Sequence, residues 1–342
     1  MHPSTEPPSL VLESIAGKRV LVTGADGFIG SHLTELLAAE GAQVRALTQY
    51  NSFNNWGWLE DLPCLRQLEV VPGDIRDSSF CLDLTQGIDV VFHLAALIAI
   101  PFSYKSPNSY IDTNIQGTAN VCRAALTNGV RTVIHTSTSE VYGTAEYVPM
   151  DEKHPLKPQS PYSATKIGAD AIALSYHYAF HLPLRIARPF NTFGPRQSSR
   201  AVIPTIISQI AAGSAEVSLG DTTTTRDFTF VEDTCRGLLA IASMPGHHGE
   251  IFNVGTGSEI SVADLFETIN ELMGGTARIV QDTSRFRPAD SEVRRLCCDN
   301  RKIRAATGFQ PRVSLRSGLQ RTIDWITDPC RLRYYKTNIY NV

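Results

Sequence analysis

The heptapeptide GADGFIG at residues 24–30 decides the fold of this chain. An apolar run, KRVLVT, precedes it at residues 18–23, and SHLTELLAAE follows at residues 31–40 with leucines at helical spacing and Gly41 as a stop. Glycines between a strand and a helix let the backbone turn tightly and approach a pyrophosphate, which the helix N-terminus attracts. The spacing GxxGxxG therefore predicts a dinucleotide-binding turn between the first strand and the first helix.

Outward from this turn, strand and helix patterns alternate. Ser160 suits the N-cap of a helix, and Pro161 suits its first position. Further strands are expected at residues 42–47, 70–71, 89–94, 132–136 and 184–187, and helices at residues 114–126 and 161–180. This alternation predicts an α/β fold with a doubly wound parallel sheet of the Rossmann type.

After residue 189 turn residues become frequent and the strand and helix patterns shorten. We interpret this half as a smaller C-terminal α/β cap that binds substrate. The expected domains are a disordered tail (1–16), a dinucleotide-binding domain (17–189), a mainly substrate-binding domain (190–330) with a strand near 251–254 returning to the core, and a tail (331–342).

The composition favours a globular enzyme. Of 342 residues, 42% are hydrophobic, and the formal net charge of -3 gives no electrostatic case for nucleic acid or an acidic membrane. No apolar run reaches the length of a membrane span, and the N-terminus shows no signal-peptide pattern, so a cytoplasmic enzyme is expected. None of the seven cysteines lies in a CxxC pair, and no His/Cys cluster has metal-ligand spacing, so no metal is expected.

The end of the second predicted strand should distinguish NAD from NADP. An acidic residue there would bind the ribose hydroxyls, whereas an arginine would suit a 2′-phosphate. This chain has Leu47-Thr48-Gln49-Tyr50, which provides neither, and Arg45 lies inside the strand, where a structural role is expected. Because no basic cluster follows, NAD is favoured and NADP stays open.

The motif YSATK places Tyr162 and Lys166 four residues apart, on one face of a helix. An ammonium group near a phenol favours the phenolate and lowers a pKa that starts near about 10. Tyr162 is therefore a candidate base toward a sugar or alcohol hydroxyl. A second candidate, Glu140, stands in TSTSEVYG at residues 136–143, at the carboxyl end of a predicted central strand, where sites in this architecture lie.

Six motifs in order carry a family resemblance. They are GADGFIG, HLAA at 93–96, TSTSEVYG, YSATK, RPFNTFGPR at 188–196 and RDFTFVED at 226–233. From about residue 17 to about 327 the chain resembles the nucleotide-sugar enzymes of the extended short-chain dehydrogenase/reductase family. YNSFNNWGWL at 50–59, HLAALIAIPFSY at 93–104 and SPYSATKIGAD at 160–170 most resemble the NAD-dependent 4,6-dehydratases of legionaminic acid-type biosynthesis, which act on a nucleotide-linked N-acetylglucosamine.

The resemblance implies roles for the catalytic residues. Thr138 would orient the C4 oxygen, and Tyr162 with Lys166 would take the C4 hydroxyl proton. Glu140 would then remove the C5 proton as water leaves from C6. Ser139 stands where many dTDP-glucose dehydratases carry an Asp acid, so the donor of a proton to the leaving hydroxyl stays open: Glu140, a water held by Ser139, or another group.

The resemblance also implies binding residues and a homodimer. Arginine suits bidentate phosphate contact. His93 lies at a strand end, where we expect a packed, hydrogen-bonded histidine rather than a catalytic one. The cofactor-binding residues would be Gly24, Gly27, Phe28, Ile29, Gly30, Asp74, Ile75, Leu94, Ala95, Ala96, Tyr162 and Lys166, and the substrate-binding residues Asn191, Arg196, Arg226 and Arg287.

The sequence is also compatible with three other functions. A UDP-glucuronate decarboxylase shares STSEVYG and RxFNTFGPR but lacks the YNSFNNWGWL stretch. An epimerase needs no carboxylate beside the catalytic threonine, so Glu140 disfavours it. A non-catalytic nucleotide-sensing scaffold of the same fold usually loses the tyrosine or the lysine, whereas this chain keeps both. The nucleotide base of the substrate, UDP, GDP or another, stays open.

Overall fold

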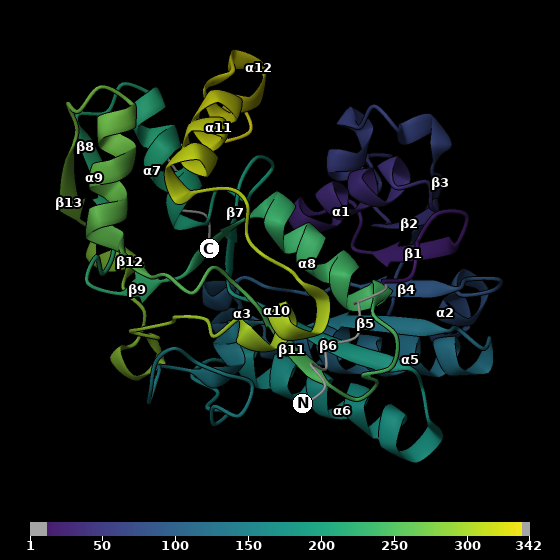
Figure 1. Ribbon diagram of the computed structural model, residues 1–342. Coiled ribbons are helices and arrows are strands. Elements are labelled where there is room, and N and C mark those ends of the chain that lie inside the picture. Colours follow the sequence, from purple (N-terminus) through teal and green to yellow (C-terminus); the bar gives the residue numbers. More distant parts are fainter. Residues whose placement is uncertain (1–11, 337–342) are drawn as a thin grey trace, which may run out of the picture.

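The computed structural model describes residues 12–336 and centres on a seven-stranded parallel sheet (Figure 1). The strands run in the order β11 (Ile251–Val254), β6 (Leu184–Pro189), β5 (Thr132–Thr136), β4 (Val90–His93), β1 (Arg19–Thr23), β2 (Gln43–Gln49) and β3 (Glu69–Gly73). This confirms the predicted doubly wound parallel sheet. The strands are nearly continuous apolar runs because both faces are covered: Val20 and Val22 join one core cluster, while Leu21 joins the other.

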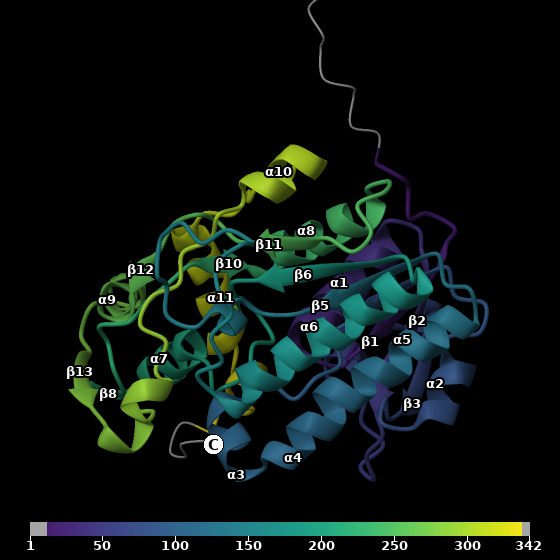
Figure 2. The same ribbon diagram turned by 90° about the horizontal axis from the view of Figure 1, so that it is seen from below.

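Helices lie on both faces of the sheet. One face carries α1 (Phe28–Ala39) and α8 (Val231–Ser243), and the other carries α2 (Ser78–Leu84), α5 (Gly117–Thr127) and α6 (Pro161–Phe180). Figure 2 shows α5 and α6 lying side by side beneath the strands. The predicted start of α6 is confirmed, because Ser160 and Ser163 form a capping box and Pro161 occupies the first turn.

Two continuous helical stretches begin earlier than their sequence patterns suggest. Helix α1 starts at Phe28 with Gly27 as its N-cap, because the glycine turn leads directly into the helix. Helix α5 is preceded without a break by α4 (Pro107–Tyr110) and a π-helical stretch, Ile111–Gln116, and α3 (Ile100–Lys105) lies just upstream. The apolar periodicity marks only the segments that face the sheet.

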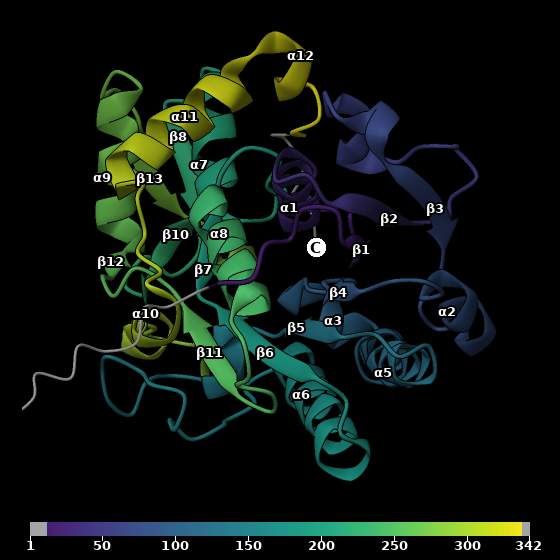
Figure 3. The ribbon, with the colours of Figure 1, turned by 45° about the vertical axis from the view of Figure 1, so that its right-hand side comes forward.

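The chain after β6 builds a smaller unit beside the sheet, as Figure 3 shows. Three two-stranded pairings form it: β7 (Asn191–Phe193) with β10 (Phe228–Phe230), β8 (Glu216–Leu219) with β13 (Arg278–Gln281), and β9 (Thr225–Arg226) with β12 (Ile260–Ser261). Its helices are α7 (Val202–Ala211), α9 (Val262–Leu272) and α11 (Leu315–Thr327), with the short α10 (Arg301–Thr307) and α12 (Pro329–Leu332) nearby. Between these elements α8 and β11 return to the central sheet.

The segments expected to be tails contact the core where the structure describes them. Residues 1–11 and 337–342 lie outside the described residues. Ile15 is buried, and Glu13 N–H donates to Ser243 C=O. At the other end Tyr335 is buried and its hydroxyl donates to Gln197 C=O. Among residues 12–336, no helix combines the length and apolar character needed to cross a membrane.

Candidate active site

The glycine turn forms a tight backbone cradle. Gly24 has a φ of +68°, and a Cβ there would lie 2.9 Å from Ala95 N. A Cβ on Gly30 would lie 2.0 Å from Gly24 O, so the start of α1 packs directly on the end of β1. The first-turn N–H groups of α1, among them those of Phe28 and Ile29, have no acceptor within the helix. This geometry fits a pyrophosphate, as the sequence predicts.

His93 fixes the wall opposite the glycine turn. Thr23 Oγ1 lies 2.8 Å from His93 Nδ1 and accepts the N–H groups of Leu94 and Ala95, each at 3.1 Å. Thr118 Oγ1 lies 3.0 Å from the other ring nitrogen. Burial lowers the pKa of His93 well below its usual value. The imidazole is thus a neutral structural group, as expected from its place at a strand end.

Thr138, Glu140 and Tyr162 come together beyond the carboxyl end of β5. A one-turn helix, Ser139–Tyr142, follows the strand, and Thr138 caps it by accepting Glu140 N–H at 3.2 Å. The pKa of Tyr162 is raised by burial; hydrogen bonding with Thr138 acts to lower it, and the charge of Glu140 acts to raise it. The Thr138 hydroxyl and the Glu140 carboxylate therefore both influence the ionisation of the Tyr162 phenol.

Lys166 lies on the same helix as Tyr162, and its ammonium contacts the end of β5. Its ammonium donates to Thr136 C=O at 2.7 Å, and burial lowers its pKa to about 8. Burial raises the pKa of Tyr162, whereas the spacing of the tyrosine and the lysine predicts a lowered one. In these side chains alone, burial of the phenol outweighs any effect of the lysine charge, so they do not by themselves stabilise the phenolate.

A buried polar network that the sequence did not reveal lies beneath this site. Asp170 Oδ2 accepts from Arg188 Nε and Nη2 at 3.1 and 2.9 Å and from Ser137 Oγ at 2.9 Å. Arg188 Nη1 also donates to the Tyr142 hydroxyl at 3.0 Å, and that hydroxyl donates to Asn253 Oδ1 at 2.7 Å. The network ties the Glu140 turn to α6, β6 and β11. Tyr142 is therefore a structural residue, with a pKa that burial raises to about 12.

Asp170→Asn should destabilise the fold by about 3–5 kcal/mol, because it leaves Arg188 buried without its anion. Urea unfolding of the variant and the parent chain measures the difference. Asp324→Asn, which alters an exposed carboxylate bonded to Gln320, is the matched control and should change stability by less than about 0.5 kcal/mol. A loss for Asp170→Asn no larger than that of the control would contradict the role given to the network.

Two of the predicted phosphate-binding arginines share one carboxylate. Arg226 Nη2 and Arg287 Nη1 each lie 3.3 Å from Glu292 Oε1. Arg226 is almost fully buried; burial lowers its pKa, while the charge of Glu140 acts to raise it. Glu292 is not among the residues that the sequence predicts for the site, although it lies only five residues after Arg287. Arg226 therefore lies within electrostatic reach of Glu140, and the two arginines are already paired with the carboxylate of Glu292.

The other two predicted substrate contacts differ. Asn191 begins β7, and its buried Oδ1 has no hydrogen-bond partner among residues 12–336, which suits a ligand contact. Arg196, in contrast, pairs with Glu35 at 2.8 Å and bonds Ser31 Oγ at 3.4 Å, both on α1. The expectation that Arg196 lies with the other arginines is not supported by these contacts, because a carboxylate on α1 takes its guanidinium.

The predicted adenine turn is built around Asp74 and Ile75. Asp74 forms an ion pair with Arg76, which holds the pKa of the carboxyl below its usual value. Ile75 is buried, and its carbonyl accepts Asn120 Nδ2 at 2.9 Å. The turn follows β3 directly, beside the end of β2. A role in binding adenine stays a prediction.

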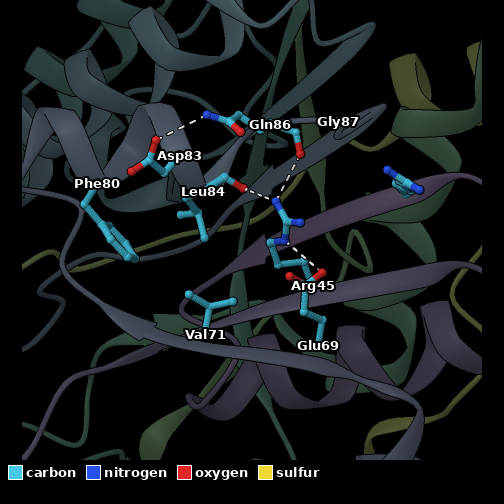
Figure 4. A pocket seen from close by; sticks show the side chains of 9 residues that line it. Arg45, Glu69, Val71, Phe80, Asp83, Leu84, Gln86 and Gly87 are labelled. Atoms are coloured by element: carbon cyan, nitrogen blue, oxygen red, sulfur yellow. Dashed lines mark hydrogen bonds and ion pairs between the residues drawn. The ribbon is translucent and has the colours of Figure 1, made fainter.

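A pocket of about 460 Å³ lies at the opposite, amino end of the sheet (Figure 4). Arg45 crosses it, donates to the carbonyls of Leu84 and Gln86, and pairs with Glu69 at 3.0 Å. These contacts give Arg45 the structural role that its position suggests. Because sites in parallel sheets lie at the carboxyl ends, this pocket is separate from the active site. Within residues 12–336 no three His, Cys, Asp or Glu side chains are grouped as metal ligands would be.

Comparisons with known proteins agree on the family. Residues 21–322 match the family model described as GDP-mannose 4,6 dehydratase. The dTDP-glucose 4,6-dehydratase of Streptomyces antibioticus is 34% identical over 313 residues, which cover 90% of this chain and 92% of its own. The UDP-glucose 4-epimerase of Mycolicibacterium smegmatis is 35% identical over 320 residues, with coverage of 90% and 98%.

A solved structure extends the similarity to three dimensions. DesIV, a dTDP-glucose 4,6-dehydratase from Streptomyces venezuelae crystallised with NAD and TYD bound, matches with a TM-score of 0.82 and 32% identity over 91% of this chain and 97% of its own. Dehydratases and epimerases thus both stand among the relatives. On this similarity, and on the parallel sheet and glycine turn that explain it, the chain belongs to the extended short-chain dehydrogenase/reductase family, among its nucleotide-sugar 4,6-dehydratases and epimerases.

Proposed function

We propose that this protein is an NAD-dependent 4,6-dehydratase that converts a nucleotide-linked N-acetylglucosamine to the 4-keto-6-deoxy sugar. The observation that carries the proposal is the position of Glu140. Its carboxylate follows Thr138 by two residues and acts on the pKa values of both Tyr162 and Arg226. Removal of the C5 proton needs a base beside the residues that act on the C4 hydroxyl of the sugar. A 4-epimerase does not perform this step.

The residues present fit NAD. The cradle of Gly24 and Gly30 admits a pyrophosphate where any Cβ would intrude, and Leu94 and Ala95 form its far wall. When bound, NAD would supply the hydride acceptor and, in its oxidised form, a positive charge that favours the phenolate of Tyr162. Lys166, with a pKa near about 8, is mostly protonated at neutral pH and would hold a cofactor hydroxyl.

The side chains then divide the chemistry. Tyr162, assisted by Thr138, takes the C4 hydroxyl proton as the sugar is oxidised at C4. The C4 ketone acidifies C5–H, and Glu140 removes that proton while water leaves from C6. Ser139 is buried and carries no carboxylate, so the leaving hydroxyl takes its proton from Glu140, from water or from another group. Reduction at C6 and reprotonation at C5 complete the turnover.

The diphosphate of the substrate would lie on Arg226 and Arg287, with Asn191 beside the sugar–diphosphate link. The N-acetylglucosamine assignment rests on the resemblance of residues 50–59, 93–104 and 160–170 to legionaminic acid-type dehydratases, with UDP or GDP as the nucleotide. By the same resemblance we expect a homodimer.

Glu292→Gln should tighten the binding of UDP or GDP about five- to tenfold, because the phosphates no longer compete with a carboxylate for the arginine pair. Removing one such competing charge about 4 Å away is worth about 1 kcal/mol when water screens it fully, and each 1.4 kcal/mol or so is about tenfold in affinity. Isothermal titration calorimetry on the holoenzyme measures the affinity.

Glu271→Gln, which removes an exposed carboxylate paired with Arg316, is the control and should leave nucleotide binding unchanged. Weaker nucleotide binding by Glu292→Gln would show instead that Glu292 aligns the arginines for phosphate.

Mass spectrometry of products from a panel of sugars tests the proposed function. The panel contains UDP- and GDP-N-acetylglucosamine, dTDP-glucose and UDP-glucuronate, each incubated with NAD. Loss of one water from an N-acetylglucosamine substrate is the expected result and names the nucleotide. Loss of carbon dioxide from UDP-glucuronate would identify a decarboxylase. Bound NAD without any turnover would point to a nucleotide-sensing scaffold.

A further inference from the structure

The end of β2 lacks the carboxylate that an NAD-binding sheet needs there, yet a carboxylate lies against it. Strand β2 ends at Gln49, followed by Tyr50, and neither residue is acidic. Asp26, in the middle of the glycine turn, extends its side chain to this point, and its Oδ2 accepts Gln49 N–H at 3.1 Å. The turn thus places an anion at the strand end from a neighbouring segment.

The backbone of Asp26 is held as firmly as its side chain. Its carbonyl accepts Trp58 N–H at 3.1 Å, which closes the loop between residues 50 and 58 onto the glycine turn. Asn51 orders this loop by bonding Asn55 C=O at 2.7 Å and Phe53 N–H at 3.1 Å. The carboxylate of Asp26 is therefore fixed between the pyrophosphate cradle and the end of β2.

The charged groups near the end of β2 disfavour a further phosphate. Gln49 pairs with Gly73 at the end of β3, so Asp74 follows immediately beside it. Arg76, a cation close to this edge, is engaged by Asp74 through Nε at 2.9 Å and through Nη2. Arg45, the arginine of β2 itself, is bonded to carbonyls at the amino end of the sheet. Asp26 and Asp74 thus present two carboxylates at this edge, and Asp74 neutralises Arg76.

We propose that Asp26 selects NAD over NADP by accepting a hydrogen bond from a ribose hydroxyl of the adenosine half of the cofactor, so that the glycine turn supplies the carboxylate that β2 lacks. This inference rests on the proposed function only in requiring that a nicotinamide dinucleotide binds. A carboxylate at that point accepts a hydroxyl proton and repels a 2′-phosphate. The acid stands in the glycine turn rather than in β2, but its carboxylate still reaches the end of β2.

Asp26→Asn separates this role from a structural one. Asparagine has nearly the same shape and keeps an oxygen that accepts Gln49 N–H, so the loop should stay in place, while the charge is lost. We expect the dissociation constant for NAD to rise about tenfold, as for loss of a charge-assisted hydrogen bond, and that for NADP to fall or stay constant. The preference for NAD over NADP should therefore fall at least about tenfold.

Titration of the full-length chain with NAD and with NADP, followed by calorimetry, gives both constants without recourse to activity. Asp83→Asn, at the amino end of the sheet, is the control and should leave the ratio unchanged. An unchanged ratio in Asp26→Asn, with or without a lower melting temperature, would overturn the inference, as would a parent chain that prefers NADP. Failure of the parent chain to bind either dinucleotide would instead overturn the proposed function.

Discussion

Glu140→Gln should abolish dehydration while leaving oxidation at C4 intact. Glutamine preserves the size of the side chain but cannot take the C5 proton, and loss of a general base costs about 10²- to 10⁴-fold in rate. The released product measures dehydration. Single-turnover absorbance of the reduced cofactor measures C4 oxidation, which should persist and leave the intermediate trapped before elimination.

The charges around Glu140 explain why C4 oxidation survives. The carboxylate acts to raise the pKa of Tyr162, so its removal makes the phenolate easier to form. Dehydration by Glu140→Gln at more than about a tenth of the parent rate would mean that another group takes the C5 proton. Glu146→Gln, six residues further along, offers a control outside the catalytic set and should leave both steps unchanged.

Tyr162→Phe should abolish both C4 oxidation and dehydration, by about 10²- to 10⁴-fold. The hydroxyl that hydrogen-bonds with Thr138 is lost, while the buried ring that packs near Tyr110 is kept. NAD affinity and melting temperature should change little. Stopped-flow absorbance of the reduced cofactor gives the rate of the first step directly.

The Glu140 and Tyr162 variants together separate two steps. Tyr162→Phe should form no reduced cofactor, whereas Glu140→Gln should form it and stop. Tyr176→Phe, on the same helix, should behave like the parent chain because it lies nearly three turns beyond Lys166. Normal C4 oxidation by Tyr162→Phe would remove Tyr162 from the catalytic set.

The local features of this fold could be predicted because each is encoded by neighbouring residues. The glycine turn needs only two close backbone approaches, at Gly24 and Gly30, and the start of α6 needs only Ser160, Pro161 and Ser163. Each of these signals lies within seven residues of sequence. The family resemblance adds the order of the six motifs along the chain, which no single segment contains.

The features that escaped prediction depend on residues distant in sequence. Asp170 and Arg188 meet because α6 packs beside β6, and Glu292 reaches Arg226 across 66 residues of chain. Arg196 pairs with Glu35 of α1, which lies 161 residues away in the sequence. The spacing of Tyr162 and Lys166 predicts a lowered phenol pKa, but burial, which the sequence does not reveal, raises it.

In the proposed reaction, hydrogen moves from C4 to C6 of one sugar while Glu140 exchanges the hydrogen at C5. The most direct measurement uses the nucleotide sugar that turns over, labelled with deuterium at C4 and incubated with the holoenzyme in ordinary water. We expect deuterium at C6 of the product, in a molecule that has lost one water. Deuterium returned to C4, without loss of water, would show epimerase-type chemistry and rule out the proposed dehydration.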